Sequence, residues 1–299
     1  WVLAMATRHS PNVVNFLLVD FKGGSSFTAV RELPHSVGLI TDLDERSARR
    51  ALTSLRAELR YRERTLADAG VRSIEQLPPE HPLARLVVVV DEFAAMVQDF
   101  PELHELFADI AARGRSLGVH LILCTQRPAG VVRDAVLANC ALRISLRVNN
   151  RADSTAVIGS TAAAELPRVP LGRALVCLPG EAPLAVQVAL ADEADSGTVV
   201  SRWGRPSAGL ARELQPGDDG TRAGVFLKPR RPWCDPLPAR VPLDELLGDT
   251  VADAGDGDGL VFGLADLPQE QRQDRARYNP WRHGRLVVLG GHRSGKSGM

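Results

Sequence analysis

The sequence predicts an α/β fold built on a doubly wound, mostly parallel sheet. Continuous apolar runs alternate with segments in which leucines recur at helical spacing. The run Leu86–Val90 is rich in β-branched residues, as is typical of a central parallel strand covered on both faces. The run Arg285–Leu289, apolar after its first residue, leads into the glycine-rich loop Gly290–Ser297, which is the strand–loop order of phosphate-binding α/β domains.

The first domain is expected to span residues 1–203. Its expected strands lie at residues 13–20, 37–40, 86–90, 119–125 and 142–148. Its expected helices run from Asp42 to Gly70, over about residues 101–116, and near residues 133–139. This alternation predicts that the strands join one parallel sheet. Residues 164–190, which are interrupted by prolines and glycines, are expected to form hairpins that close the domain.

The composition changes after Trp203. Residues 204–258 are rich in Pro, Gly, Asp and Arg, which predicts a linker. The apolar run Leu260–Leu264 then begins a second unit, expected at residues 259–299. In that unit Arg285–Leu289 is expected to be a buried strand in front of the phosphate-binding loop.

The charge, the cysteine content and the short apolar runs argue against several classes of function. The 36 basic and 36 acidic residues give no net charge, which argues against a basic field over the whole chain but not against a local basic groove. The four cysteines are scattered without a C-x-x-C pair, which argues against a metal or redox role. The apolar runs are far too short to span a bilayer, so we expect membrane contact only through segments outside this chain.

The terminal loop carries the strongest motif of the chain. Gly290, Gly295, Lys296 and Ser297 fit the pattern G-x-x-x-x-G-K-[ST]. The candidate phosphate-binding residues are Gly290, Gly291, His292, Arg293, Ser294, Gly295, Lys296 and Ser297. In such a loop the backbone N–H groups cradle the phosphates, the lysine neutralises their charge, and the serine hydroxyl binds magnesium. ATP and Mg²⁺ are therefore the expected cofactors.

An acid pair follows the apolar run Leu86–Val90. Asp91 and Glu92 directly follow that run, and a parallel strand carries such residues to the edge of the sheet where ligands bind. There Asp91 would hold Mg²⁺, and Glu92 would orient or deprotonate the attacking water. The alternative is a strand that happens to end in two surface acids.

Two further residues are candidates for roles around the phosphates. Gln126 follows the next expected strand and is expected to sense the γ-phosphate, although any strand tip can carry Thr and Gln. Arg115 lies near a predicted helix end and is a candidate arginine finger acting on a neighbouring subunit. Surface arginines are common in this chain, so an ordinary surface role is the alternative for Arg115.

Several segments resemble the motor domains of the FtsK/SpoIIIE family, in the family's order. The matching segments are Leu17–Gly24, Leu33–His35, Ile40–Asp42, the helical stretch from Glu58 to Arg62, the Walker B-like Val88–Glu92, and His120–Pro128 with its Thr-Gln-Arg-Pro sequence. The resemblance covers about residues 1–190 and returns at 259–299. It implies a P-loop NTPase fold of the RecA-like type.

The repetition of motor domains indicates which members of the family this chain resembles most. FtsK and SpoIIIE DNA pumps carry one motor domain, whereas here a second phosphate-binding loop follows the first domain through a connector. This arrangement is similar to that of the EccC/EssC ATPases of type VII secretion, as are the segments Pro242–Leu247 and Gly263–Asp274. The resemblance implies a hexameric ATPase at the cytoplasmic face of the cell membrane that exports small helical proteins.

The resemblance also separates the motifs into two sites. Trp1 looks like part of the helix that follows a phosphate-binding loop, so the loop belonging to Asp91 is expected upstream of this chain. Lys296 and Ser297 would belong to a different site from Asp91. We therefore expect the 299-residue chain alone to hydrolyse ATP negligibly.

Two alternatives to a secretion motor remain open. One is a DNA translocase of the same family, with double-stranded DNA as its substrate. The other is a degenerate domain that serves as a regulatory or scaffold module. Retention of both Asp91 and Glu92 weighs against a complete loss of catalysis.

Overall fold

The computed structural model describes residues 1–21, 26–41, 45–131, 134–191, 193–203, 229–232, 236–247 and 259–289. By its internal contacts the chain divides into two compact units, Trp1–Pro232 and Trp233–Met299. The helix start expected at Asp42 and the loop Gly290–Ser297 lie outside the described residues.

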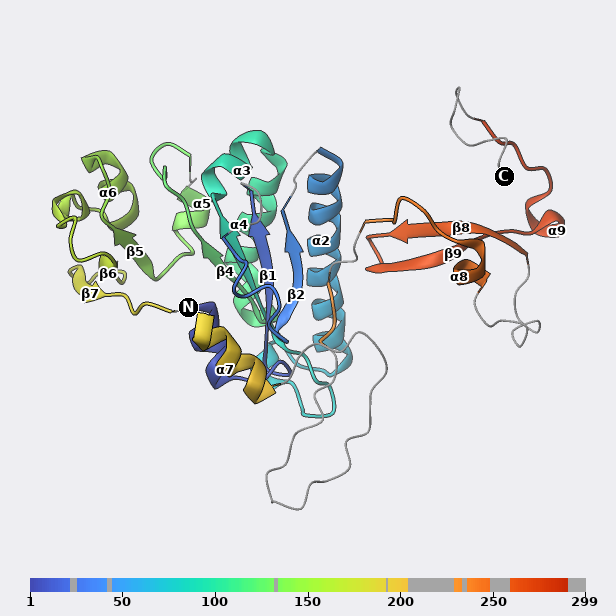
Figure 1. Ribbon diagram of the computed structural model, residues 1–299, viewed down its shortest axis with the longest axis horizontal. Helices are drawn as coiled ribbons and strands as arrows, with labels where there is room; N and C mark the ends of the chain where they lie inside the picture. The colour runs from blue at the N-terminus through green and yellow to red at the C-terminus, as the bar shows by residue number, and fades with distance from the viewer. Residues whose placement is uncertain are drawn as a thin grey trace, which may run out of the picture. The chain divides into compact units, whose positions relative to one another are not determined.

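The first unit is organised around a four-stranded sheet with the order β2-β1-β3-β4 (Figure 1). Its strands are β1 (Val14–Asp20), β2 (Ser36–Ile40), β3 (Arg85–Asp91) and β4 (Val119–Leu123), and each neighbouring pair is parallel. All seven residues of β1 are buried, as are the five inner residues of β3. The prediction of a doubly wound parallel sheet is therefore confirmed.

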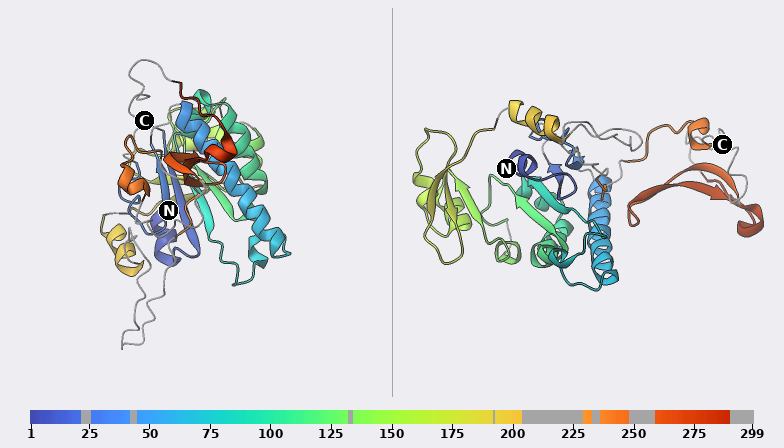
Figure 2. Two further views of the ribbon diagram at one scale, coloured as in Figure 1. Left: turned by 90° about the vertical axis from the view of Figure 1, so that its right-hand side faces the viewer. Right: turned by 90° about the horizontal axis from the view of Figure 1, so that it is seen from below.

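Helices cover both faces of this sheet (Figure 2). They are α1 (Val2–Arg8), α2 (Glu45–Asp68), α3 (Phe93–Asp99), α4 (Glu102–Leu117) and α7 (Glu193–Trp203). On one face α1 and α7 pack together, and Ala6 and Val199 join Phe16 and Val89 in one apolar cluster. Because successive strand residues point to opposite faces, Val90 faces the other side, where α2 and α4 pack against each other.

A buried arginine fastens α2 to the amino-terminal edge of the sheet. The Arg62 side chain is nearly inaccessible, and its Nε donates to Glu58 Oε1 at 2.6 Å. Its other nitrogens donate to the carbonyl oxygens of Leu117 at 3.0 Å, Gly118 at 3.3 Å and Ala84 at 2.8 Å. Burial lowers the pKa of Arg62, and the charge and hydrogen bond of Glu58 oppose that shift. The helix is thereby tied to the starts of β3 and β4.

A short part of the predicted linker packs on the same helix. The Arg230 guanidinium pairs with the second oxygen of Glu58 and stacks over the Tyr61 ring, 3.6 Å from its centroid. Arg231 Nε donates to the carbonyl oxygen of Val37 at 3.1 Å. Residues 229–232 therefore belong structurally to the first unit.

The strand expected at residues 142–148 does not join the parallel sheet, so that expectation was wrong. The observed strand β5 (Arg143–Leu146) pairs antiparallel with β6 (Arg173–Cys177), which pairs antiparallel with β7 (Leu184–Gln187). Apolar and polar residues alternate strictly from Leu142 to Val148, a pattern typical of antiparallel strands rather than of buried parallel ones. The β6–β7 pair confirms the hairpin expected between residues 164 and 190.

The remaining helices beside these strands are short. They are α5 (Asp134–Leu137) and α6 (Arg151–Ile158). Ile158, the last residue of α6, packs with Ala163 and with Leu175 of β6 in one apolar cluster. A parallel crossover needs a dozen or more residues, usually with a helix that covers the sheet. The four residues of α5 offer little such cover, which accords with the antiparallel placement of β5.

The second unit contains a long antiparallel hairpin, β8 (Leu260–Leu267) and β9 (Arg272–Tyr278), with α8 (Leu243–Leu247) and α9 (Pro280–His283). The predicted buried strand Arg285–Leu289 is absent: these residues have no regular structure, and Leu289 is 89% exposed. No strand in the described ranges pairs with this run, so its apolar side chains have no sheet to join. None of the described helices is long and apolar enough to cross a membrane.

The contact between α4 and β4 leads to a prediction about Gly114. A Cβ at this position would lie 2.3 Å from the carbonyl oxygen of Val119, a backbone atom that cannot move aside alone. We expect Gly114→Ala to lower the free energy of unfolding by about 1–3 kcal/mol through overpacking, measured by denaturant titration.

Gly197→Ala is the matched control, because Gly197 lies in α7 and a Cβ there meets open space. This variant should be neutral or more stable by up to about 1 kcal/mol, since alanine favours helix over glycine. Equal effects of the two substitutions would contradict the close approach at Gly114.

Candidate active site at the carboxyl edge of the parallel sheet

Two aspartates lie side by side at the carboxyl ends of the central strands. The parallel pairing of β1 with β3 aligns Asp20 with Asp91. In open α/β sheets, ligands bind outside this edge. Asp91 thus lies at the carboxyl edge of the sheet, where it was expected, and its binding role stays a prediction. Asp20 was predicted only as the end of a strand.

Both oxygens of the Asp91 carboxylate accept hydrogen bonds. The backbone N–H of Glu92 donates to Oδ1 at 3.0 Å, and the Ser26 hydroxyl donates to Oδ2 at 2.8 Å. Ser26 in turn donates its backbone N–H to Asp20 Oδ2 at 3.1 Å. Sequence reasoning did not identify Ser26 or Asp20 as site residues. Asp20 carried a usable signal, since it ends an apolar run as Asp91 does.

Glu92 occupies an unusual backbone conformation for its residue type. It has φ 55° and ψ 42°, in the left-handed region, and it is the residue that precedes α3. The residue is buried, at 6% exposure. A non-glycine residue in this conformation costs on the order of 1 kcal/mol, and such strain is common at functional sites. The turn lets α3 leave the sheet immediately after the acid pair.

The tip of β4 is fixed to the acid pair by two backbone hydrogen bonds. The N–H of Cys124 donates to the carbonyl oxygen of Val90 at 2.9 Å, and the N–H of Phe93 donates to that of Cys124 at 2.8 Å. Gln126 follows two residues later, and it is exposed at the same edge. The structure therefore brings Asp91, Glu92 and Gln126 to one edge of the sheet.

Burial and the charge of Asp91 both raise the pKa of the Cys124 thiol. Although the residue as a whole is exposed, neighbouring atoms crowd the thiol, and this desolvation raises the pKa of Cys124. The negative charge of Asp91 raises it further. Cys124 is thus expected to stay protonated near neutral pH, as a poor nucleophile.

Arg115 lies at the opposite edge of the sheet from the acid pair. It is exposed in the last turn of α4, just before β4 begins, whereas Asp91 is at the far end of β3. Five strand residues separate these edges, which corresponds to about 16 Å. Within one subunit Arg115 is therefore remote from Asp91, and any action as an arginine finger would be on a neighbouring copy.

The neighbouring Arg113 has a structural role. It pairs with Asp109 one helical turn earlier and with Glu63 of α2. Hydrogen bonding to Asp109 is the main cause of the raised pKa of Arg113. This exposed arginine links two helices, which is the ordinary alternative considered for arginines in this segment.

The acid pair suits a magnesium ion that is also held by phosphates. No group of three or more His, Cys, Asp or Glu side chains that could hold a metal occurs in the part of the chain that the structure describes. Mg²⁺ is commonly bound by one or two carboxylates together with nucleotide phosphates and water. Asp91 fits that role, while the candidate phosphate-binding residues Gly290–Ser297 lie outside the described residues.

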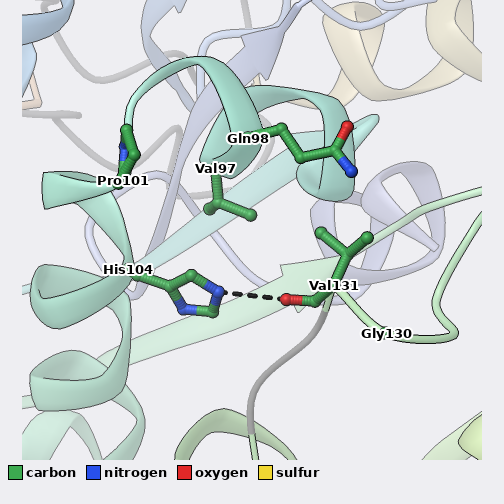
Figure 3. Close-up of a pocket in the computed structure, with 6 residues that line it drawn as sticks. All are labelled: Val97, Gln98, Pro101, His104, Gly130 and Val131. Carbon is green, nitrogen blue, oxygen red and sulfur yellow. Dashed lines mark hydrogen bonds between the residues drawn. The ribbon is translucent and has the colours of Figure 1, made fainter.

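A separate pocket lies between α3, the start of α4 and the loop after β4. It is lined by Val97, Gln98, Pro101, His104, Gly130 and Val131 (Figure 3). The Nε2–H of His104 donates to the carbonyl oxygen of Val131 at 3.1 Å, and the imidazole packs edge-on against Phe93. His104 therefore packs against Phe93, the residue next to Glu92.

The strained conformation of Glu92 is testable by comparing two truncations. Both Glu92→Gly and Glu92→Ala remove the carboxylate, but only glycine adopts a positive φ without a steric cost. We expect the glycine variant to be more stable than the alanine variant by about 1 kcal/mol in denaturant titrations.

The matched control is the same pair of substitutions at Glu102, which lies within the first turn of α4. There glycine should be less stable than alanine by up to about 1 kcal/mol. The same order of stability at both positions would argue against strain at Glu92.

Comparisons with known proteins agree with this architecture. The FtsK/SpoIIIE family profile matches residues 1–81 and 74–130. The chain is 30% identical over 342 aligned positions to the type VII secretion system protein EssC of Staphylococcus aureus, covering 97% of this chain and 22% of EssC. It is 27% identical to the ESX secretion system protein YukB of Bacillus subtilis, covering 99% of this chain and 22% of YukB.

A solved structure extends the comparison to three dimensions. The cytoplasmic domain of the type VII secretion ATPase EccC of Thermomonospora curvata matches with a TM-score of 0.77 and 30% identity, over 93% of this chain and 33% of that one. The chain thus spans about a fifth of the length of the curated relatives that it matches. With its parallel sheet and its acid pair at the carboxyl edge, the chain belongs to the FtsK/SpoIIIE family of ATPases and is of the EssC/EccC type.

Proposed function

We propose that this chain is part of an ATP-driven motor that couples nucleotide hydrolysis to the translocation of protein substrates in type VII secretion. The observation that carries the proposal is the position of Asp91 and Glu92 at the ligand-binding edge, next to the tip of β4. The likeness to the secretion proteins EssC, YukB and EccC favours protein as the substrate.

Each residue of the site has a distinct role in this proposal. Asp91 would hold Mg²⁺, and the ion would supply positive charge that neutralises the phosphates of a bound nucleotide. Glu92 orients the attacking water and accepts its proton, and the fixed backbone turn sets the direction from which it does so. Gln126 contacts the γ-phosphate or the water from the tip of β4. In this proposal the phosphates of this site are held by a loop other than Gly290–Ser297.

The second unit would contribute to a separate nucleotide site. Lys296 and Ser297 bind phosphate and Mg²⁺ there, together with the rest of the loop Gly290–Ser297. In a ring hexamer, neighbouring subunits would complete each site, and Arg115 is the candidate finger because it lies away from its own subunit's acids. We place the motor in the cytoplasm at the inner face of the cell membrane, held there by segments outside this chain.

Hydrolysis should depend on Glu92 in the full-length protein. We expect Glu92→Gln to lower the kcat of ATP hydrolysis by about 10²–10⁴-fold, since it removes a general base, as measured by phosphate release. Glu80→Gln, a change at an exposed surface acid, should leave the rate unchanged.

The 299-residue chain alone serves as the negative control, with negligible turnover expected. Robust magnesium-dependent hydrolysis by that chain, abolished by Glu92→Gln, would contradict the assignment of Asp91 and Lys296 to two sites. An unchanged rate of the full-length Glu92→Gln variant would instead identify the first domain as a regulatory or scaffold module.

The nature of the substrate should appear in what stimulates hydrolysis. We expect a peptide from a secreted helical substrate to raise the ATPase rate of the full-length protein, and double-stranded DNA to have no effect. The measurement is the rate with each ligand over a series of salt concentrations. A DNA translocase would show the reverse, with DNA binding that weakens steeply as salt rises.

A further inference from the structure

Ser26 connects the two aspartates at the carboxyl edge. Its hydroxyl donates to Asp91 Oδ2 at 2.8 Å, and its backbone N–H donates to Asp20 Oδ2 at 3.1 Å. One residue therefore presents two donors to two carboxylates that end neighbouring strands. The residue precedes Asp91 by 65 positions in the sequence.

The electrostatics of the edge explain why a donor is needed there. The register aligns Asp20 with Asp91, and neighbouring strands are about 4.8 Å apart. Two carboxylates at such a separation repel each other, and the repulsion is strongest where burial excludes water. Asp20 is only 1% exposed. The N–H and O–H of Ser26 place positive ends of dipoles on both carboxylates, which offsets this repulsion.

The same contact fixes the orientation of Asp91. The N–H of Glu92 holds Oδ1, and the Ser26 hydroxyl holds Oδ2, so the plane of the carboxylate is set by two donors from different segments. Without the hydroxyl, the N–H of Glu92 would be the remaining donor of this pair. The carboxylate could then rotate about its terminal bond. A ligand of Mg²⁺ that rotates binds the ion less well than one held in place.

We propose that Ser26 is a positioning residue for Asp91: it bridges Asp20 and Asp91 and so presents the Asp91 carboxylate to magnesium. The proposal rests on the proposed function, in which Asp91 holds Mg²⁺. The hydroxyl of Ser26 acts through Asp91, and Asp20 anchors the backbone of Ser26.

The first test asks whether the Ser26 hydroxyl contacts Asp91 in this chain without any nucleotide. It uses the pKa of the Cys124 thiol as the readout. Burial is the main cause of the raised pKa of the Cys124 thiol, and the charge of Asp91 raises that pKa further. A change in how well the Asp91 charge is compensated should therefore shift the titration of the thiol. The pH dependence of Cys124 alkylation by iodoacetamide is followed by peptide mass spectrometry, which distinguishes it from the other cysteines.

The variants give opposite shifts if the bridge exists. Ser26→Ala leaves the Asp91 charge less compensated, so the alkylation midpoint moves to higher pH. Asp91→Asn removes the charge and moves the midpoint to lower pH. Ser26→Thr keeps the hydroxyl and leaves the midpoint unchanged. A midpoint that is the same in Ser26→Ala and in the unmodified chain would overturn the bridge.

The second test measures magnesium dependence in the full-length protein. We expect Ser26→Ala to raise the Mg²⁺ concentration for half-maximal ATP hydrolysis by about 10–100-fold, the usual effect of removing a residue that orients a metal ligand. Ser26→Thr should restore the original value. Ser36→Ala is the matched control, because the Ser36 hydroxyl donates to the carbonyl oxygen of Val30 and not to the acids.

The outcomes separate this proposal from the proposed function. If Glu92→Gln abolishes hydrolysis but Ser26→Ala leaves the magnesium requirement unchanged, the motor function stands and the role of Ser26 is refuted. If Glu92→Gln leaves the rate of ATP hydrolysis unchanged, the proposed motor function is refuted. The Cys124 alkylation midpoint then still shows whether Ser26 contacts Asp91. A lower magnesium requirement in Ser26→Ala would show that the hydroxyl competes with the ion, which also overturns the proposal.

Discussion

The site depends first on the parallel register between β1 and β3. The two strands pair without a shift from Val14 opposite Arg85 to Asp20 opposite Asp91. A slip by one residue would exchange the two faces of a strand and separate the aspartates. Burial on both faces limits such a slip, because the inner residues of both strands fill apolar cores on either side of the sheet. The packing of the sheet thereby determines which side chains meet at its edge.

The two edges of the sheet serve different purposes. At the amino-terminal edge, Arg62 is buried with Glu58 and three backbone carbonyls, so its charge is compensated although water is excluded. Removal of one partner from such a pair commonly costs about 3–5 kcal/mol. Arg230 shares Glu58, which ties part of the predicted linker to this edge. The carboxyl edge holds the strained Glu92 and the paired aspartates, where stability is given up for the geometry of the site.

Site residues that are adjacent in the sequence are the easiest to predict. Asp91 and Glu92 stand directly behind a buried strand, and that local pattern is sufficient to place them. Ser26 was missed because its partner lies 65 positions away and because single serines carry no distinctive pattern. The strand β5 was assigned to the wrong sheet, since strand–helix alternation was weighed above the alternation of apolar and polar residues within the strand. Leu289 is exposed because its apolar run pairs with none of the strands in the described residues.

The sequence by itself determined the four strands of the main sheet and their parallel character, the family resemblance and the acid pair, because each of these follows from local periodicity or a short motif. Only the tertiary structure decided that Asp20 and Ser26 join Asp91, that Arg115 lies at the opposite edge, and that Arg230 packs on α2. These contacts depend on strand register and on which helix covers which face. Both are set by packing between segments far apart in the chain, and no local pattern encodes them.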